Sequence, residues 1–209
     1  MAFKINGIYY QERIPDVTLG GCIEIYENIL PNTISAINDI EKEAQNPDSG
    51  VSWTRAGTIG AGAFQNARTN RLMDITYTSD VFNNPVVQNL NNLFHSLLIA
   101  TTNSYASRFN INENFHLENF QLLKYSGGEE YKAHYDGGTS IGRCISALCY
   151  MNDDYEGGEI EFVNFGIKIK PQAGMMILFP SNYAYSHVAH PVTKGTKYAL
   201  VTWVRDRIV

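Results

Sequence analysis

The second half of the chain consists of short extended segments separated by turn signals, and this feature most constrains the fold. Glycine pairs, Pro180 and runs rich in asparagine or aspartate lie between segments of four to nine residues that favour strands. Many short strands so closely spaced are typical of a β-sandwich or jelly roll. The predicted strands lie near residues 118–125, 132–137, 143–151, 159–163, 166–170, 175–179, 185–189 and 197–205.

Two helices are predicted in the first half of the chain. The first, at about 32–45, has Asn32 as its candidate N-cap, and the second, at about 84–108, has Asn84 as its cap with Pro85 in its first turn. Each has apolar residues at helical spacing, which indicates one buried face. These residues are Ile34, Ile37, Ile40 and Ala44 in the first helix, and Val86, Val87, Leu90, Leu93, Phe94, Leu97 and Leu98 in the second.

The whole chain is predicted to form a single domain, because 209 residues are enough to bury a substantial core without being long enough to require a second one. We expect an α+β protein that is mainly β, with helical support over about 1–117 and a double-stranded β-helix, or jelly-roll, core over about 118–209. Residues 51–70 contain several glycines and little periodicity. They predict a long loop, either a lid over a site or a plain surface loop.

Composition limits the partners and the compartment. The net charge of −5 provides no basic field, which argues against a nucleic-acid backbone as the main partner. No apolar run is long enough to cross a membrane, and the first twenty residues do not have the pattern of a signal peptide. The three cysteines lack the spacing of a disulfide scaffold, so we expect reduced thiols in a cytoplasmic protein, with Cys144 and Cys149 on opposite faces of a strand.

His134 and Asp136 form the first part of a candidate metal site. They lie two residues apart in a predicted strand, so both side chains should point to the same face. An imidazole and a carboxylate are two of the three ligands of a 2-His-1-carboxylate iron site. The missing histidine must be distant in sequence, and the candidates are His187 and His190. Because these two are three residues apart on a predicted strand, both cannot point to the site.

The order and spacing of these residues resemble a known family, the iron(II)- and 2-oxoglutarate-dependent dioxygenases, in their prolyl 4-hydroxylase branch. The resemblance is dense over about 118–205 and rests on His134-x-Asp136, then His187, then Lys197 ten positions later. Further landmarks follow in the same order. They are the segments 125–131 (YSGGEEY), 155–159 (YEGGE) and 174–181 (GMMILFPS).

The resemblance implies a cofactor and a cosubstrate site. His134, Asp136 and His187 would bind Fe(II), leaving three coordination positions for 2-oxoglutarate and O2. Lys197 would bind the remote carboxylate of 2-oxoglutarate, because an anion in an apolar pocket needs a cation. Tyr125, nine residues before His134, would reach the same cosubstrate, and L-ascorbate is the implied reductant.

Three further residues match positions that flank the peptide substrate in this family: Arg143, Trp203 and Tyr131. An aromatic ring and a guanidinium suit a proline ring and its peptide carbonyl. The resemblance therefore implies hydroxylation at C4 of a proline in a peptide or protein, with succinate and CO2 as co-products.

One position departs from the pattern. Some peptidyl-prolyl hydroxylases have a hydroxyl residue directly after Gly-Gly-Glu, whereas this chain has Ile160, so one contact with the cosubstrate is missing or replaced. Three alternatives stay open: hydroxylation of a free amino acid or another small molecule, nucleic-acid demethylation, and a jelly-roll binding module without enzymatic activity. The sequence predicts neither the oligomeric state nor the identity of the substrate.

Overall fold

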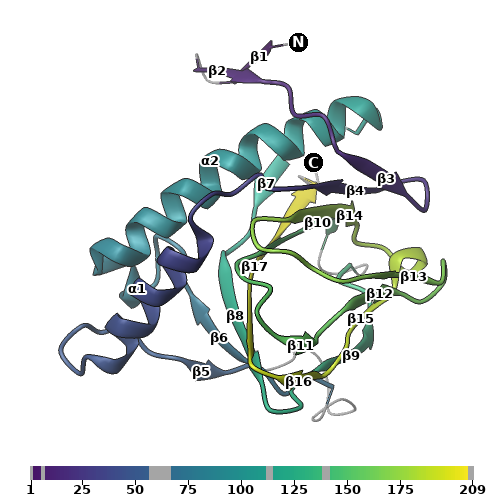
Figure 1. Ribbon diagram of the computed structural model, residues 1–209. Helices are drawn as coiled ribbons and strands as arrows, with labels where there is room; N and C mark the ends of the chain where they lie inside the picture. Colours follow the sequence, from purple (N-terminus) through teal and green to yellow (C-terminus); the bar gives the residue numbers. More distant parts are fainter. Residues whose placement is uncertain (1, 6–7, 57–66, 112–114, 138–141, 207–209) are drawn as a thin grey trace.

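Two larger sheets and two α-helices form most of the described structure, together with two small two-stranded sheets (Figure 1). A computed structural model describes residues 2–5, 8–56, 67–111, 115–137 and 142–206. The major sheet has nine strands, and every pairing in it is antiparallel. In spatial order these are β3 (Val17–Leu19), β4 (Ile23–Tyr26), β14 (Met176–Pro180), β10 (Arg143–Tyr150), β17 (Thr196–Asp206), β8 (Gln121–Ser126), β6 (Arg71–Asp74) and β5 (Thr54–Arg55), with β7 (Phe115–Leu117) also paired to β17.

The minor sheet has four antiparallel strands. Its order is β13 (Ile167–Ile169), β12 (Ile160–Phe162), β15 (His187–Ala189) and β9 (Tyr131–His134). The smaller elements are the pair β1 (Ala2–Ile5) and β2 (Ile8–Gln11), the pair β11 (Glu156–Gly157) and β16 (Val192–Lys194), and the 3-10 turns η1 (Asp80–Asn83) and η2 (Tyr183–Tyr185). This sheet-dominated architecture is consistent with the expected jelly-roll core.

Alternation along β17 separates the two faces of the major sheet. Tyr198, Leu200 and Val204 belong to the cluster that includes the helices, whereas Val201 and Trp203 belong to a cluster on the opposite face. Successive strand residues point to opposite faces, so one strand contributes to both layers. The face turned away from the helices is the one that can line a site.

Helix α2 (Pro85–Arg108) begins as expected, and α1 (Thr33–Gln45) begins in a different way. The side chain of Asn84 accepts a hydrogen bond from the backbone of Val86, which caps α2. Asn32 precedes α1 but adopts a left-handed conformation with φ 58° and makes no capping hydrogen bond. The prediction of a side-chain cap at Asn32 was therefore wrong.

The apolar faces of the helices are narrower than predicted. In α1 the buried positions are Thr33, Ile37 and Ile40, and Ile34 is 52% exposed. In α2 Leu93 is 44% exposed although most of the predicted stripe is buried. Both residues lie at the border of an apolar face, where helical spacing alone does not distinguish a buried position from an exposed one.

The first half of the chain contributes strands as well as helices. β3 and β4 extend the major sheet beyond β14, and β5 and β6 extend it beyond β8. The predicted loop at 51–70 thus contains a short strand at Thr54–Arg55. Whether this loop is a lid depends on residues 57–66, which lie outside the described part of the chain. Within the described residues, no helix is long and apolar enough to span a bilayer.

An irregularity in β10 overturns one prediction about the cysteines. A register shift between Arg143 and Ile145 interrupts the pairing of β10 with β17. Because such a bulge breaks the alternation of side chains, Cys144 and Cys149 both contact the helix-side cluster instead of opposite faces. Cys149 is buried, and Cys22 and Cys144 are half-buried.

A buried ion pair joins the end of α2 to β4. The Arg108 guanidinium donates two hydrogen bonds to the Glu24 carboxylate, at 2.7 and 2.6 Å, and Tyr26 donates a third at 2.6 Å. Glu24 is only 1% exposed. An unpaired carboxylate at this depth would be strongly destabilising.

We therefore expect Arg108→Ala to lower the free energy of unfolding by about 3–5 kcal/mol, because it leaves Glu24 charged and unpaired. Urea denaturation followed by tryptophan fluorescence measures this change. The double variant Arg108→Met with Glu24→Leu removes both charges and should be markedly more stable than Arg108→Ala. Equal losses in the two proteins would show that packing, and not the unpaired charge, determines the effect.

Candidate metal centre

His134, Asp136 and His187 form one compact cluster between the two sheets. Strand β9 ends at His134 and β15 begins at His187, and these two residues are directly paired. The Nε2 atoms of His134 and His187 lie 3.6 and 3.8 Å from the two carboxylate oxygens of Asp136. One ligand atom from each of the three residues lies within 4.8 Å of the others, and among the described residues this is the sole group of its kind.

The backbone orients both histidines. Nδ1 of His134 lies 2.7 Å from the carbonyl of Lys132, and Nδ1 of His187 lies 3.1 Å from the carbonyl of Tyr185. A carbonyl oxygen can only accept a hydrogen bond, so Nδ1 carries the proton in each ring and Nε2 presents its lone pair toward Asp136. This is the tautomer that a metal ligand requires.

His190, the rival to His187, lies outside the cluster. Its Nε2 atom is 2.7 Å from a carboxylate oxygen of Glu161, a partly exposed ion pair on the minor sheet. The three-residue separation predicted that the two histidines would point in different directions, and the structure shows this arrangement.

Asp136 is held in place by buried hydroxyls and by a close backbone contact. Ser146 donates a hydrogen bond of 2.7 Å to its carboxylate, and Ser181 lies 2.8 Å from the same hydroxyl. The next residue, Gly137, donates from its backbone to the carbonyl of Ser181, and a Cβ atom there would lie 2.8 Å from that oxygen. Position 137 therefore needs glycine if this segment is to stay beside Ser181.

The protonation states also suit a cation. Burial and then the neighbouring His187 lower the pKa of His134 to about 4, so its imidazole is neutral at pH 7. Burial alone would raise the pKa of Asp136, but His187, His134 and the Ser146 hydroxyl outweigh burial and hold it below its usual value. A neutral imidazole and an ionised carboxylate are donors that a facial iron(II) site requires.

A cavity of about 1,260 Å³ opens from this cluster along the inner face of the major sheet. Every site residue predicted from the sequence lines it. They are His134, Asp136, His187, Lys197, Tyr125, Arg143, Trp203 and Tyr131. The other lining residues include the apolar Leu123, Leu148, Ile160 and Val201.

Lys197 is a buried cation on the wall of this cavity. It is 2% exposed, and its ammonium donates a hydrogen bond of 2.6 Å to the carbonyl of Gly158. Within the described part of the chain no carboxylate lies within ion-pair distance of it. Burial, and then the charge of Lys170, lower its pKa to about 7. Such a group matches an anionic ligand that enters the cavity.

Two tyrosines surround Lys197, and one of them has an unsatisfied hydroxyl. The ammonium lies 5.5 Å from the ring centroid of Tyr125, its neighbour on β8, and 5.0 Å from that of Tyr150. The buried hydroxyl of Tyr150 has no hydrogen-bond partner among the described residues. A carboxylate would satisfy the lysine and this hydroxyl together, so the residues present fit 2-oxoglutarate. Sequence reasoning did not identify Tyr150.

Steric contacts explain why residues 157 and 158 are both glycine. Gly158 adopts φ 68°, and a Cβ atom there would lie 3.2 Å from the side chain of Lys197. At Gly157 a Cβ atom would lie 2.3 Å from the carbonyl of Pro191. The two glycines therefore allow the backbone to approach both Lys197 and the loop before β16.

Arg143 and Trp203 form one wall with a residue that the sequence did not indicate. The guanidinium of Arg143 stacks over the Trp203 ring at 3.6 Å, and it donates bonds of 2.9 and 2.7 Å to Glu118. Arg205 contacts the same carboxylate at 2.5 Å. Glu118 thus neutralises part of the charge at this wall. An isolated glutamate in a loop carries no signal that would have revealed this role.

Aromatic rings pack against both ligand histidines. Tyr131 stacks on His134 with centroids 3.5 Å apart and planes 14° apart, and Phe179 meets His187 edge-on at 4.9 Å. Arg68, missed in the sequence, lies 5.1 Å from the Tyr131 ring and lines the cavity. These contacts restrict the rotation of the imidazoles.

Comparisons with known proteins agree with this geometry. The sequence profile of the 2OG-Fe(II) oxygenase superfamily matches residues 120–205. A probable prolyl 4-hydroxylase 9 of Arabidopsis thaliana is 35% identical over 121 residues, covering 44% of this chain and 42% of that protein. Prolyl 3-hydroxylase 2 of Homo sapiens is 46% identical over 66 residues, covering 29% of this chain and 9% of that protein. The chain thus spans less than half the length of these relatives.

Solved structures share the fold. A viral collagen prolyl hydroxylase from Paramecium Bursaria Chlorella virus-1, solved with 2OG, has a TM-score of 0.59 at 21% identity and covers 89% of this chain and 97% of its own. A prolyl hydroxylase from Trichoplax adhaerens, in complex with a hypoxia inducible factor peptide fragment, has a TM-score of 0.68 at 20% identity, covering 90% and 84%.

The sequence match includes both strands that contribute ligand histidines, and the fold and the His-Asp-His cluster agree with it. The segment 120–205 therefore belongs to the 2OG-Fe(II) oxygenase superfamily, and the chain resembles the prolyl hydroxylases of that superfamily.

Proposed function

We propose that this protein is an Fe(II)- and 2-oxoglutarate-dependent dioxygenase that hydroxylates a C–H bond, at C4 of a proline in a peptide. The observation that carries the proposal is the presence in one cavity of a facial His-Asp-His cluster and a buried lysine that has no acidic partner among the described residues. A jelly-roll binding module requires neither feature.

This proposal assigns a role to each polar group near Lys197 and the metal cluster. Bound iron and 2-oxoglutarate supply the activation of O2, with one oxygen atom going to the substrate and one to succinate as CO2 leaves. Lys197 binds the remote carboxylate, and the hydroxyls of Tyr125 and Tyr150 donate to it. The apolar side chains around them exclude water, which strengthens the charge pairing. Tyr150 would provide a hydroxyl where Ile160 provides none.

The choice of substrate depends on the part of the cavity near Trp203, six residues along β17 from Lys197. The stacked pair of Arg143 and Trp203, with Tyr131 beside His134, provides a flat aromatic and cationic surface next to the cluster. Such a surface suits a proline ring and its peptide carbonyl. The similar proteins include both a prolyl 4-hydroxylase and a prolyl 3-hydroxylase. An experiment must therefore distinguish hydroxylation at C4 of the proline from hydroxylation at C3.

Mass spectrometry of proline-containing peptides tests the reaction. The protein is incubated with Fe(II), 2-oxoglutarate, O2 and ascorbate, and products are hydrolysed and compared with 3- and 4-hydroxyproline standards. A gain of one oxygen that yields 4-hydroxyproline is expected. Oxidation of free amino acids without any peptide product would overturn the substrate, and absence of 2-oxoglutarate turnover would overturn the activity.

We expect His187→Ala to abolish iron binding and 2-oxoglutarate turnover, because it removes one of three ligands. Iron content by atomic emission and succinate by chromatography measure both effects. His190→Ala is the matched control, since this histidine lies in the same segment but pairs with Glu161, and it should retain both properties. Loss in the control but not in His187→Ala would reverse the assignment of the distal ligand.

Binding of 2-oxoglutarate should be coupled to proton uptake above neutral pH. Lys197 has a pKa of about 7 in the free protein, and only its charged form can pair with a carboxylate. At pH 8 binding should therefore take up about 0.9 proton, and affinity should fall about tenfold per pH unit above this pKa. Calorimetry in buffers of different ionisation enthalpy, on the Mn(II)-loaded protein without O2, measures the uptake.

Two variants of Lys197 separate charge from structure. Lys197→Arg remains charged throughout this range, so it should lose the proton uptake while keeping measurable affinity. Lys197→Met should bind 2-oxoglutarate at least tenfold more weakly than wild type and retain the metal. Equal weakening of metal and 2-oxoglutarate would count against the role proposed for Lys197.

A further inference from the structure

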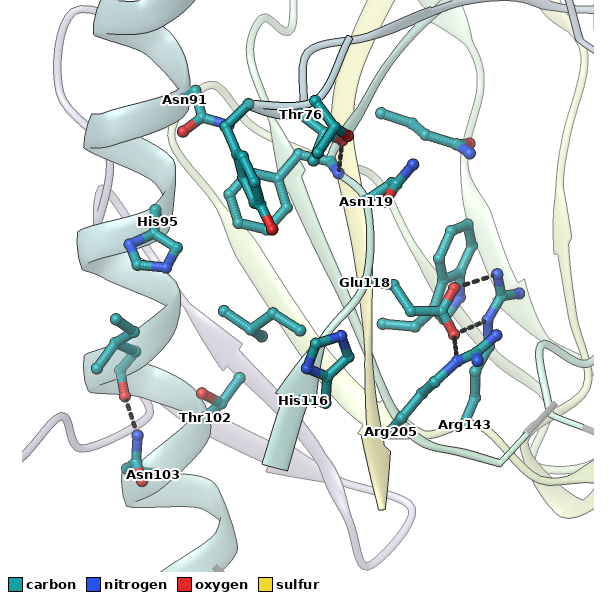
Figure 2. A pocket seen from close by; sticks show the side chains of 17 residues that line it. Thr76, Asn91, His95, Thr102, Asn103, His116, Glu118, Asn119, Arg143 and Arg205 are labelled. Carbon is teal, nitrogen blue, oxygen red and sulfur yellow. Dashed lines mark hydrogen bonds and ion pairs between the residues drawn. The ribbon is translucent and has the colours of Figure 1, made fainter. Parts of the chain in front are cut away.

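A second cavity of about 720 Å³ lies beside the first, between α2 and the end of β17 (Figure 2). Figure 2 shows His95 and Asn103 on α2 facing one side of it and His116 on β7 facing the other. Five residues line both cavities, which makes them a shared wall. These are Glu118, Gln121, Arg143, Trp203 and Arg205.

The two cavities lie one after the other along β17. Alternate residues of this strand, from Lys197 to Arg205, line the first cavity, and Trp203 and Arg205 also line the second. Eight residues of strand span about 26 Å. A dicarboxylate of five carbons bound at Lys197 occupies only the first part of this length. The space beyond the metal cluster, toward Arg205, therefore suits an extended substrate.

Most polar groups of the shared wall already have partners. Glu118 is bound by Arg143 and Arg205, as Figure 2 shows. The indole N–H of Trp203 is buried and makes no hydrogen bond among the described residues, although it lies near enough to Asp136 to help lower the pKa of that carboxyl. The side-chain oxygen Oε1 of Gln121 is likewise buried and has no hydrogen-bond partner among the described residues.

Gln121 is placed to face a ligand. It begins β8, and Leu123 and Tyr125, the alternate residues that share its face, also line the first cavity. It pairs with Val201 of β17, next to Trp203 on that face. A buried acceptor without a partner is costly to keep unless a ligand provides the donor. A peptide presents one such donor, the backbone N–H, at every residue except proline.

We propose that the substrate peptide passes from the metal cluster into the second cavity, and that Gln121 Oε1 accepts a hydrogen bond from the backbone N–H of a residue beside the target proline. This inference rests on the proposed peptide hydroxylation and adds a positioning contact and a path for the chain. Asn91, Asn103 and Asn119, which also line the second cavity, use their amide N–H groups within the protein.

A set of methylated peptides tests the contact at Gln121. The probe is a library of nine-residue peptides with a central proline, and four further libraries each carry an N-methyl group at one of the two positions on either side. Oxygen gain is measured by mass spectrometry with wild type and with Gln121→Leu. We expect Gln121→Leu to lower kcat/KM about tenfold or more, mainly through KM.

One methylated library should reproduce this loss in wild type, because its peptides lack the N–H that Gln121 would accept. The same methyl group should cause no further loss in Gln121→Leu, since the two changes remove one interaction. Thermal unfolding midpoints show whether the variant is folded. Independent, additive effects at all four positions would overturn the contact.

A second pair of variants tests the path. Asn103→Trp fills part of the second cavity from the side of α2. It should lower kcat/KM for nine-residue peptides but not for tripeptides with a central proline. Ser96→Trp on the exposed face of the same helix is the control and should act as wild type on both. Equal losses on long and short peptides would overturn the path, whereas no oxygen gain with wild-type protein would overturn the proposed function itself.

Discussion

The antiparallel pairing of β9 with β15 is the contact on which the site depends. It sets His134 directly opposite His187, although 52 residues separate them in the sequence. Backbone carbonyls of Lys132 and Tyr185 then fix both rings in the same tautomer, and Asp136 is brought to both Nε2 atoms by the turn after β9. A shift of this pair by one residue would turn a histidine to the other face and dismantle the cluster.

The site also depends on a buried cation, Lys197, that has no acidic partner in the part of the chain that the structure describes. Burial lowers the pKa of Lys197 to about 7, which means that the folded protein destabilises its charged form. A carboxylate partner within the chain would remove this cost, but it would also occupy the place of the cosubstrate. The chain instead surrounds Lys197 with two tyrosine rings and one carbonyl, which solvate the ammonium weakly and leave it able to bind an anion.

Sequence reasoning located the residues whose placement depends on spacing along a strand. Alternation predicts that His134 and Asp136 converge, and the predicted jelly-roll strands lie near the observed ones. It did not predict that Glu118, Gln121 and Tyr150 line the cavity. Their placement depends on which strands are adjacent in the sheet, and the sequence of a short segment does not show which distant segment pairs with it. Asn32 failed as a cap for a related reason, since the path of the chain from β4 places it in a left-handed conformation.

The helices explain why the inner face of the major sheet can remain hollow. A sheet needs one well-packed face to be stable, and α1 and α2 provide it through the cluster that includes Ile40, Phe94 and Leu200. The opposite face is then free to carry polar groups that do not satisfy one another. The ion pair of Arg108 with Glu24 joins the helical layer to the sheet. The packing of the helices therefore provides the stability that offsets the cost of buried polar groups without hydrogen-bond partners on the inner face.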